Sequence, residues 1–316
     1  MASFFDTKSL AKVTEIAKTP AAQACIGGLI LLSLTGRWNR WMSRRRTNNY
    51  DTDKTWDWKK EIVVITGASS GIGAKVVSKL ERDNVKVIIL DLNKPPGRTG
   101  PNTSFYQIDL TSPDEIVSTA QKIRSEHGEP TVLINNAGMG LPMPSVEMPE
   151  PKLRKMFEVN ILAPMLLVQQ FLPSMVKRNH GHIVNISSMA AFCTQAINVP
   201  YACTKVALLA YHEGLIQELR HLYKAPLVRA TVVHPTWVRT AMTQDLFNTG
   251  KLNDTTVDPD HLAGLIVDQI YSGYGAQLVV PPNLGWVSVV RGLPTWLQEN
   301  IRDGVTTTVL KGMGIM

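Results

Sequence analysis

Ile62-Val-Val-Ile-Thr-Gly-Ala-Ser-Ser-Gly-Ile-Gly73 is the stretch around which the rest of the 316-residue chain can be interpreted. Its first four residues form an apolar run suited to a β-strand that is buried on both faces. A glycine-rich turn over residues 66–73 follows, and residues 74–80 place apolar side chains at helical spacing. A strand, a glycine turn and a helix in this order are typical of a unit that binds a dinucleotide.

Each glycine of this turn has its own physical role. Gly67 permits the tight turn, Gly71 lets a pyrophosphate approach the backbone, and Gly73 lets the helix pack against the strand. The amino end of the helix then faces the phosphates. The G-x-x-x-G-x-G spacing departs from the more general G-x-G-x-x-G pattern, so the structural context carries the identification. The other cofactor contacts expected in this turn are Ser69, Ser70 and Ile72.

A second apolar run, residues 85–90, predicts a strand that ends at Asp91. A carboxylate at that position can accept hydrogen bonds from the adenosine ribose and would repel a 2′-phosphate. Neither Ser70 nor Leu92 is basic, which favours NAD, although the nearby Lys94 keeps NADP open. The alternative for Asp91 is an ordinary polar residue at a strand end.

The rest of the body alternates strands with helices. Strands are expected near 104–108, 131–134, 227–233 and 276–280, and helices near 113–127, 152–178 and 200–222. This alternation predicts right-handed crossovers and an α/β fold with a doubly wound, Rossmann-type parallel sheet. Ligands of such sheets bind at the carboxyl ends of the strands. Asp109 and Leu110, which follow the third strand, are therefore further candidates near the adenine.

Tyr201 and Lys205 are four residues apart, so on a helix they project from the same face. A free tyrosine loses its proton near pH 10, and a neighbouring ammonium favours the phenolate and lowers that pKa. Such a tyrosine can give a proton to a forming alkoxide or take one from an alcohol. Ser188 could hold the substrate oxygen against it. Alone the pair is weak evidence, because most such pairs lie on solvated helix faces.

Taken together, these motifs resemble the short-chain dehydrogenase/reductase family in their order and spacing. They are residues 66–73, Asn135-Asn-Ala-Gly138, Ser188 and Tyr201-x-x-x-Lys205. The resemblance covers roughly residues 60–280. It implies an enzyme in which a hydride passes between NAD(P) and an alcohol or its carbonyl, with Tyr201 transferring the proton.

The resemblance also implies roles for single residues. Ser188 would orient the substrate oxygen, and Lys205 would tune Tyr201 and hold the ribose. Asn160, in Val159-Asn-Ile161, would be the fourth catalytic residue. It would bend its helix and hold a water that links Lys205 to solvent.

Two more segments would contact the cofactor on the same grounds. Asn136, with Ala137 and Gly138, would lie beside it, and Val238 and Thr240 would contact the carboxamide. Most members have glycine where this chain has Thr236, so the backbone path there is a departure. His234 is expected to pack at a strand end rather than to act in catalysis.

Positive charge is concentrated at the amino end. Of the net charge of +7, residues 1–60 carry +6. Residues 19–36 contain no charged side chain, and five arginines and two tryptophans follow in residues 37–46. This pattern is typical of a membrane–water interface. We therefore predict a lipid anchor over residues 19–46, as a tilted span or an interfacial helix, with a core helix as the alternative.

The carboxyl-terminal part is unusually apolar. Residues 269–290 carry no charge, and Pro281-Pro282 excludes one continuous spanning helix. We expect an element that lies against lipid or covers the substrate entrance. The predicted divisions are an anchor and linker (1–57), a catalytic domain (58–283) and an extension (284–316).

Two further loops are candidates for the substrate site. Met139, Met143 and Met148 follow the fourth strand, and methionines suit an adaptable apolar pocket as well as a plain packed loop. Residues 241–257 are polar and irregular, and are expected to form a lid.

Composition excludes several classes of function. None of the three cysteines has zinc spacing, and their odd number gives no disulfide framework, which suits a reduced, cytosol-facing environment. We expect no metal, and no nucleic-acid partner because the body is nearly neutral.

The anchor, Asp91 and the tail together resemble the membrane-associated retinol and hydroxysteroid dehydrogenases of the family. We therefore expect a small lipophilic substrate (retinoid, steroid, fatty alcohol or polyketide-like) at the endoplasmic reticulum or a lipid droplet. Helices 152–178 and 200–222 could form a homodimer. The alternatives are an NADPH-dependent ketoreductase of a biosynthetic pathway and a catalytically idle membrane scaffold that binds the cofactor.

Overall fold

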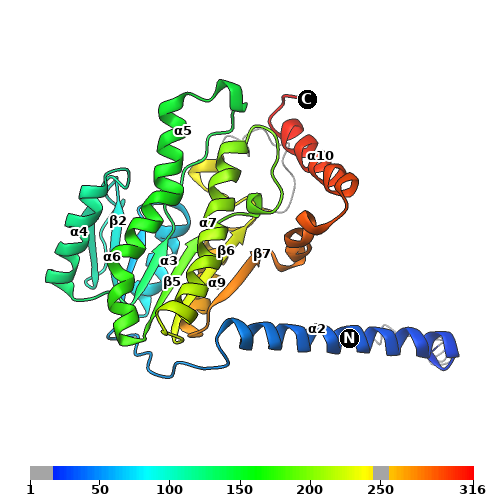
Figure 1. Ribbon diagram of the computed structural model, residues 1–316. Coiled ribbons are helices and arrows are strands. Elements are labelled where there is room, and N and C mark those ends of the chain that lie inside the picture. Colours follow the sequence, from blue (N-terminus) through cyan, green and yellow to red (C-terminus); the bar gives the residue numbers. More distant parts are fainter. Residues whose placement is uncertain (1–16, 245–255) are drawn as a thin grey trace, which may run out of the picture. The chain divides into compact units, whose positions relative to one another are not determined.

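Seven parallel strands form one sheet at the centre of the unit that runs from Asp51 to Met316 (Figure 1). The computed structural model describes residues 17–244 and 256–316, and the chain up to Tyr50 forms a separate unit. The strand order is β3-β2-β1-β4-β5-β6-β7, so the chain reverses its direction of travel between β1 and β4. The strands are β1 (Ile62–Thr66), β2 (Lys86–Asp91), β3 (Thr103–Gln107), β4 (Val132–Asn135), β5 (Gly181–Ile186), β6 (Val228–Pro235) and β7 (Ala276–Val280).

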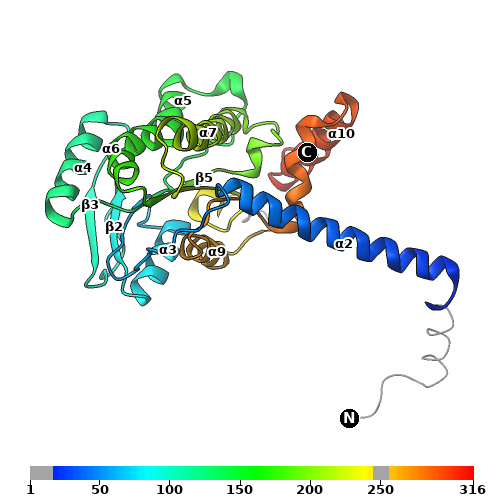
Figure 2. The same cartoon turned by 60° about the horizontal axis from the view of Figure 1, so that its bottom comes forward.

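Helices cover both faces of this sheet (Figure 2). On one face, α3 (Gly71–Arg82) and α9 (Pro259–Tyr271) pack against alternate residues of the strands. On the other, α4 (Pro113–His127), α6 (Ala163–Arg178) and α7 (Val199–Gln217) bury the intervening residues. Because both faces are covered, the central strands are continuously apolar rather than alternating.

One long helical run crosses the second face. α5 (Glu150–Phe157) continues through a π-helical turn, Glu158–Leu162, into α6. Within residues 17–244 and 256–316, Glu150–Arg178 is the single helix long and apolar enough to cross a membrane by length and composition. Leu167 and Phe171 are almost fully buried against the sheet, so this helix belongs to the core.

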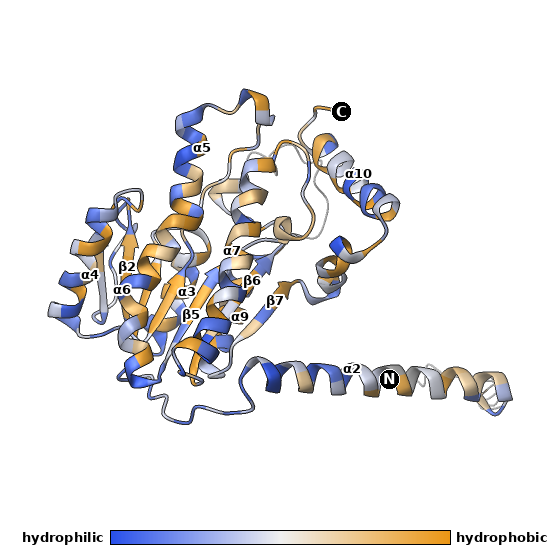
Figure 3. Ribbon diagram, in the orientation of Figure 1, coloured by the Kyte–Doolittle hydropathy of each residue, from blue (hydrophilic) through white to orange (hydrophobic). Residues whose placement is uncertain are grey.

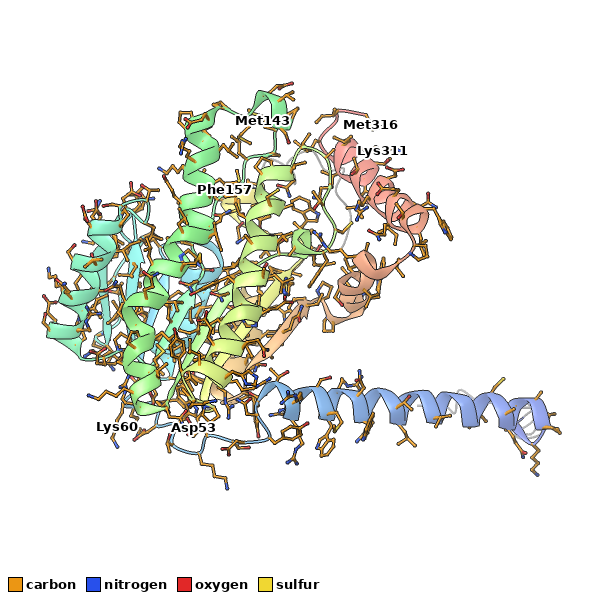
Figure 4. The ribbon with its side chains drawn as sticks, in the orientation of Figure 1. Asp53, Lys60, Met143, Phe157, Lys311 and Met316 are labelled. Atoms are coloured by element: carbon orange, nitrogen blue, oxygen red, sulfur yellow. The ribbon has the colours of Figure 1, made fainter. Side chains whose placement is uncertain are left out.

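The tail after β7 is helical. A 3₁₀ segment, Pro282–Gly292, is followed by α10 (Thr295–Gly312). Val287 and Val290 pack against Phe192 in a small apolar cluster of their own. Lys311 and Met316 lie at the same end of the unit as Met143, away from Asp53 and Lys60 (Figure 4).

The N-terminal unit contains α2 (Pro20–Thr47), a helix of 28 residues and therefore about 42 Å long. The Thr19 hydroxyl caps it by accepting a hydrogen bond from the N–H of Ala22. Its first part is apolar and its last turns are hydrophilic (Figure 3). Large apolar side chains are exposed along it at positions 31, 34, 38 and 41. The helix is thus longer than the predicted apolar run.

The predicted fold class is confirmed, and the ends of the predicted strands differ from the observed ones by at most two residues. Helices 152–178 and 200–222 each contain a π-helical turn that periodicity did not indicate. Of the predicted lid, 241–257, residues 245–255 lie outside the described residues. The predicted domain limits remain a prediction.

Candidate active site

A cavity of about 940 Å³ opens at the carboxyl ends of the strands. Its wall includes the glycine turn, the ends of β2 and β4, and the C-terminal tail. Tyr201, Lys205 and Ser188 line the same cavity. The cavity is therefore large enough to hold a cofactor and a second molecule beside it.

The glycine turn is packed so closely that side chains would not fit. Gly67 has a φ of +63°, and a Cβ there would lie 2.7 Å from the Cα of Ala137. At Gly73 a Cβ would come within 2.6 Å of both the Gly67 carbonyl oxygen and the Asn136 amide nitrogen. That amide donates to the carbonyls of Thr66 and Gly67, at 2.9 Å each. Asn136 therefore joins β4 to the turn after β1.

The amino end of α3 is open toward the cavity. Ser70 is the N-cap residue, yet its side chain makes no capping hydrogen bond, and the first turn carries no acidic residue. Gly71 and Ile72 line the cavity. Unpaired N–H groups and the positive end of the helix dipole make this a site for an anion such as a pyrophosphate. The predicted dinucleotide therefore fits the residues present.

Asp91 lies at the end of β2 and lines the cavity. One carboxylate oxygen accepts from the N–H of Ser69 at 2.9 Å, and the other from the N–H of Asn93 at 3.0 Å. These bonds fix the orientation of the carboxylate, and each oxygen retains a lone pair for a further donor. The Ser69 hydroxyl donates to the Asn93 carbonyl, so Ser69 supports Asp91 from behind the wall.

Asp109, Leu110 and Lys155 form the neighbouring part of the wall. Hydrogen bonds from the N–H and hydroxyl of Thr111, both 2.9 Å, lower the pKa of Asp109, and Lys155 adds to this. Lys155 comes from α5 and was not indicated by any motif. Lys94, which kept NADP open at the sequence level, is not part of the cavity wall.

Tyr201 and Lys205 project from the same face of α7, as their spacing predicts. The Lys205 Nζ lies 5.5 Å from the centre of the Tyr201 ring and donates to the Ile186 carbonyl at 2.8 Å. The Ser188 side chain favours the phenolate form of Tyr201 and so acts to lower its pKa. Ser188 also accepts from the N–H of Ala190 at 3.1 Å, which fixes its hydroxyl at the end of β5.

The predicted lowering of the Tyr201 pKa is wrong. Burial raises the pKa of Tyr201, because it disfavours the phenolate more than the hydrogen bond from Ser188 favours it. Burial also lowers the pKa of Lys205 to about 8. Lys205 is bound to a backbone carbonyl rather than to the phenol, which explains why its charge does not dominate.

Asn160 lies in the π-helical turn, as expected of a residue that bends its helix. It is almost fully buried. Its side-chain oxygen accepts from the N–H of Met139 at 2.8 Å, and its side-chain nitrogen donates to the Met139 carbonyl at 2.9 Å and to the Thr204 hydroxyl at 3.0 Å. A Cβ on Gly138 would lie 3.5 Å from Asn160 Oδ1 and 3.6 Å from Lys205 Nζ. Asn160 thus positions the loop after β4 next to Lys205 without lining the cavity.

His234 packs behind Ser188. Its Nδ1 lies 3.1 Å from the Ser188 carbonyl oxygen, its Nε2 lies 3.4 Å from the Gln277 amide, and its ring lies against Phe192. Burial lowers the pKa of His234 to about 4, so the ring is neutral at pH 7 and Nδ1 donates to the carbonyl. It is buried at the end of β6, where it was expected to pack.

Most predicted contact residues line the cavity. They are Gly67, Ser70, Gly71, Ile72, Asp91, Asp109, Leu110, Asn136, Ala137, Gly138, Ser188, Tyr201, Lys205, Val238 and Thr240. Ser69, Gly73 and Asn160 do not; they lie behind the wall and hold it.

The substrate side of the wall was predicted in part, because the apolar tail was expected to cover the substrate entrance and its residues do line the cavity. Met139 lines the cavity, whereas Met143 and Met148 do not. The loop between Met189 and Asn198 and the helix α10 contribute many wall residues instead. No sequence motif marks them, because they meet only through packing of distant segments.

Comparison with known proteins adds to this geometry. A family model described as short chain dehydrogenase matches residues 61–251. The chain is 43% identical over 195 residues to dehydrogenase RED2 of Cochliobolus heterostrophus, covering 61% of this chain and 74% of that one. It is 31% identical over 193 residues to human 17-beta-hydroxysteroid dehydrogenase 13, covering 58% of this chain and 64% of that one. The aligned part thus spans under two thirds of the latter.

Solved structures share the fold. A 4-hydroxyisoleucine dehydrogenase complexed with NADH superposes with a TM-score of 0.64 at 24% identity, over 70% of this chain and 96% of that one. A metagenomic short-chain oxidoreductase in complex with NADP gives 0.58 at 25% identity, over 71% and 97%. The two neighbours carry different nicotinamide cofactors.

Proposed function

This chain belongs to the short-chain dehydrogenase family and is an NAD(P)-dependent oxidoreductase that acts on CH–OH groups; we propose that its substrate is a lipophilic alcohol or the corresponding carbonyl compound. The observation that carries this is the cavity in which Ser188, Tyr201 and Lys205 meet a wall of apolar tail residues. Those tail residues are Leu284, Val287, Ile301, Val305, Val309 and Met313. A ligand that fills this part exchanges apolar surface for burial, worth about 25 cal/mol per Å².

When bound, the nicotinamide supplies the hydride chemistry. The glycine turn and the open end of α3 would hold its pyrophosphate, and Asp91 would accept from its adenosine ribose. Asp91 favours NAD, because a 2′-phosphate placed beside its carboxylate would be repelled. Val238 and Thr240 would lie against the carboxamide, as the family resemblance implies.

The reacting oxygen is handled by this chain's own residues. Tyr201 takes the proton from the alcohol, or gives it to the forming alkoxide, and Ser188 donates a hydrogen bond that holds the oxygen. Lys205 places an ammonium behind the ring and, with cofactor bound, would hold its ribose. Asn160 keeps the Met139 loop in position next to Lys205, where a water would link Lys205 to solvent.

Attachment to a membrane is part of the proposal. α2 presents exposed Leu31, Leu34, Trp38 and Trp41 and ends in Arg44, Arg45 and Arg46. Tryptophan and arginine at the end of an apolar helix suit the boundary of a bilayer, with the following chain in the cytosol. We propose the endoplasmic reticulum or a lipid droplet, and a homodimer that uses α6 and α7.

An NADPH-dependent ketoreductase remains the second candidate, supported by Lys155 as a cation in the wall near Asp109. The experiment is a screen of purified full-length protein with NAD and NADP against retinoids, steroids and aliphatic alcohols. We expect turnover of lipophilic alcohols with NAD and little turnover of short ones. Equal activity on ethanol-sized alcohols, or strong dependence on NADP, would contradict the proposal.

A further inference from the structure

We propose that Gln195 binds a second, uncharged polar group of the substrate, remote from the carbon that reacts. This inference rests on the proposed function and narrows it to lipophilic alcohols that carry another hydroxyl or carbonyl group. Gln195 lies in the loop between the 3₁₀ turn Met189–Ala191 and α7. Gln195 is not one of the catalytic residues that the family motifs or the geometry of the site indicate.

Gln195 is largely buried, and its amide is reached from the cavity. The residue is 8% exposed and lines the cavity. Across residues 17–244 and 256–316, no hydrogen bond of its amide is found. A ligand that fills the cavity and offers this amide no partner would leave it desolvated and unpaired, at a cost of about 1–3 kcal/mol. A ligand group that supplies the hydrogen bond is therefore favoured at this position.

Its surroundings make the unpaired amide selective. Nearby wall residues of the same loop and the tail are mostly apolar, among them Cys193, Ile197, Val287 and Ile301. In such a cavity an apolar ligand leaves the amide unpaired, whereas a ligand with a matching oxygen pairs it. A site built to bond one polar group discriminates strongly against analogues that lack the group.

The loop holds Gln195 in place from two sides. The N–H of Met143 donates to the Ile197 carbonyl at 2.7 Å, and the N–H of Ala196 donates to the Thr306 hydroxyl of α10 at 3.3 Å. Ile197 has a φ of +57°, which is rare for a β-branched residue and persists only where surrounding contacts enforce it. The amide is therefore presented by a fixed backbone.

The substrate group that pairs with Gln195 is expected to be uncharged, because the part of the wall around Gln195 carries no charge. Among the described residues, the charged ones that line the cavity are Asp91, Asp109, Lys155 and Lys205, which belong to the cofactor side and the proposed catalytic group. Wall residues from 189–198 and from the tail carry no charge. A carboxylate or ammonium buried against them would have no counter-ion, which is costly. A hydroxyl or carbonyl uses the amide's donor and acceptor without that cost.

The test compares alcohols that differ only in a remote oxygen. Estradiol is paired with 3-deoxyestradiol, and dodecan-2-ol with dodecan-2-ols that carry a keto group at carbon 5, 7, 9 or 11. Oxidation with NAD gives kcat/KM for each, and the measured quantity is the ratio of each oxygenated alcohol to its parent. Gln195→Leu removes the amide at similar volume. Thr194→Val, next to it but outside the cavity wall, is the matched control.

We expect at least one oxygenated alcohol to exceed its parent by about tenfold or more in the wild type and in Thr194→Val, the scale set by one satisfied buried hydrogen bond. In Gln195→Leu that ratio should fall to near one. If no ratio exceeds about threefold in the wild type, or if Gln195→Leu keeps the ratio, the inference is wrong. Absence of turnover of every parent alcohol contradicts the proposed function instead, and NADH binding by Gln195→Leu checks that it is folded.

Discussion

Lys205 donates from its ammonium to the backbone carbonyl of Ile186 at 2.8 Å, so the ion is held at the end of β5 rather than on the Tyr201 hydroxyl. Burial lowers the pKa of Lys205 to about 8 from 10.5. The folded protein therefore binds this proton less tightly than the unfolded chain does. The charged form of this lysine therefore costs the folded protein stability.

Replacement of Lys205 by methionine should stabilise the cofactor-free protein at pH 7. The lowered pKa of Lys205 corresponds to a destabilisation of the folded protein by roughly 3 kcal/mol. The variant avoids this cost but loses the hydrogen bond to Ile186, which is worth about 1 kcal/mol. Between about pH 8 and 10.5 the unfolded chain holds the proton and the folded one does not, so the wild type gains stability as pH rises. Urea denaturation should give the variant a free energy of unfolding about 2 kcal/mol higher than that of the wild type at pH 7. The difference should be smaller at pH 10.

Lys122→Met, on the exposed face of α4, is the control and should change stability little at either pH. A wild type that is more stable than Lys205→Met at pH 7 would show that the ammonium is better compensated than its single carbonyl partner indicates.

Asp91→Asn should change cofactor preference with little effect on the fold. The asparagine keeps an oxygen for the N–H of Ser69 or Asn93 and removes the charge that repels a 2′-phosphate. We expect wild-type kcat/KM to be higher with NAD, and the NAD-to-NADP ratio to fall by about tenfold or more in Asp91→Asn. Asp91→Ala should also narrow or reverse the preference, with a weaker hold on the glycine turn. A wild type that strongly prefers NADP would refute the assignment and direct attention to Lys94 or Lys155.

His180 should be a pH-dependent stabiliser of the linker that precedes β1. Its ring pairs with Asp53 at 2.8 Å and Glu61 at 3.3 Å, with Trp56 against it. Hydrogen bonds to Glu61 first, and also to Asp53, raise the pKa of His180. The pKa values of Asp53 and Glu61 are both lowered: burial, the largest influence, raises them, but hydrogen bonds that include His180 outweigh it.

The sign of each shift sets the window. Because the pKa of His180 is raised in the folded protein, its ion pairs contribute their full stability below pH 6.5. This contribution is lost as the pH rises through the pKa of His180 in the folded protein. Because the pKa values of Asp53 and Glu61 are lowered, these carboxylates contribute stability above pH 4.5. That contribution is lost as the pH falls through their pKa values in the folded protein. His180→Ala should therefore cost about 3 kcal/mol near pH 6 and less near pH 9. Denaturation midpoints across this range measure it, with exposed His261→Ala as control; an equal cost at both pH values would count against the ion pairs.

Residues 19–46 should hold the full-length protein on membranes. Burying the ten apolar side chains of 19–36 in lipid could contribute on the order of 10 kcal/mol before insertion costs, and the arginines add electrostatic attraction. Sedimentation should find the protein with membranes in high salt, which weakens only the electrostatic part. Deletion of residues 1–46 should weaken attachment. Recovery of the intact protein in the soluble fraction at physiological salt would return 19–36 to the core-helix interpretation.

The cofactor side of the site was predictable because local spacing determines it. The glycine turn, Asp91 and the Tyr201–Lys205 pair each lie within one strand–turn–helix or one helical turn, where sequence distance fixes spatial distance. Gln195 was not predictable, because its burial depends on α10, more than a hundred residues later, packing against its loop. Ser69 lies behind the cavity wall, where its N–H donates to Asp91 and its hydroxyl to the Asn93 carbonyl. Its contact with the cofactor stays a prediction.

The central claim is that Tyr201 moves the proton of the substrate hydroxyl, and Tyr201→Phe tests it most directly. The phenylalanine keeps the ring over which Lys205 lies and removes only the hydroxyl. Tyr211→Phe, on the same helix but outside the cavity wall, is the matched control. We predict that NADH titration gives the same Kd for all three proteins. With NAD and the best alcohol of the screen, kcat of Tyr201→Phe should fall by about a hundredfold or more, while Tyr211→Phe stays near the wild type. Turnover by Tyr201→Phe at the wild-type rate would contradict the account.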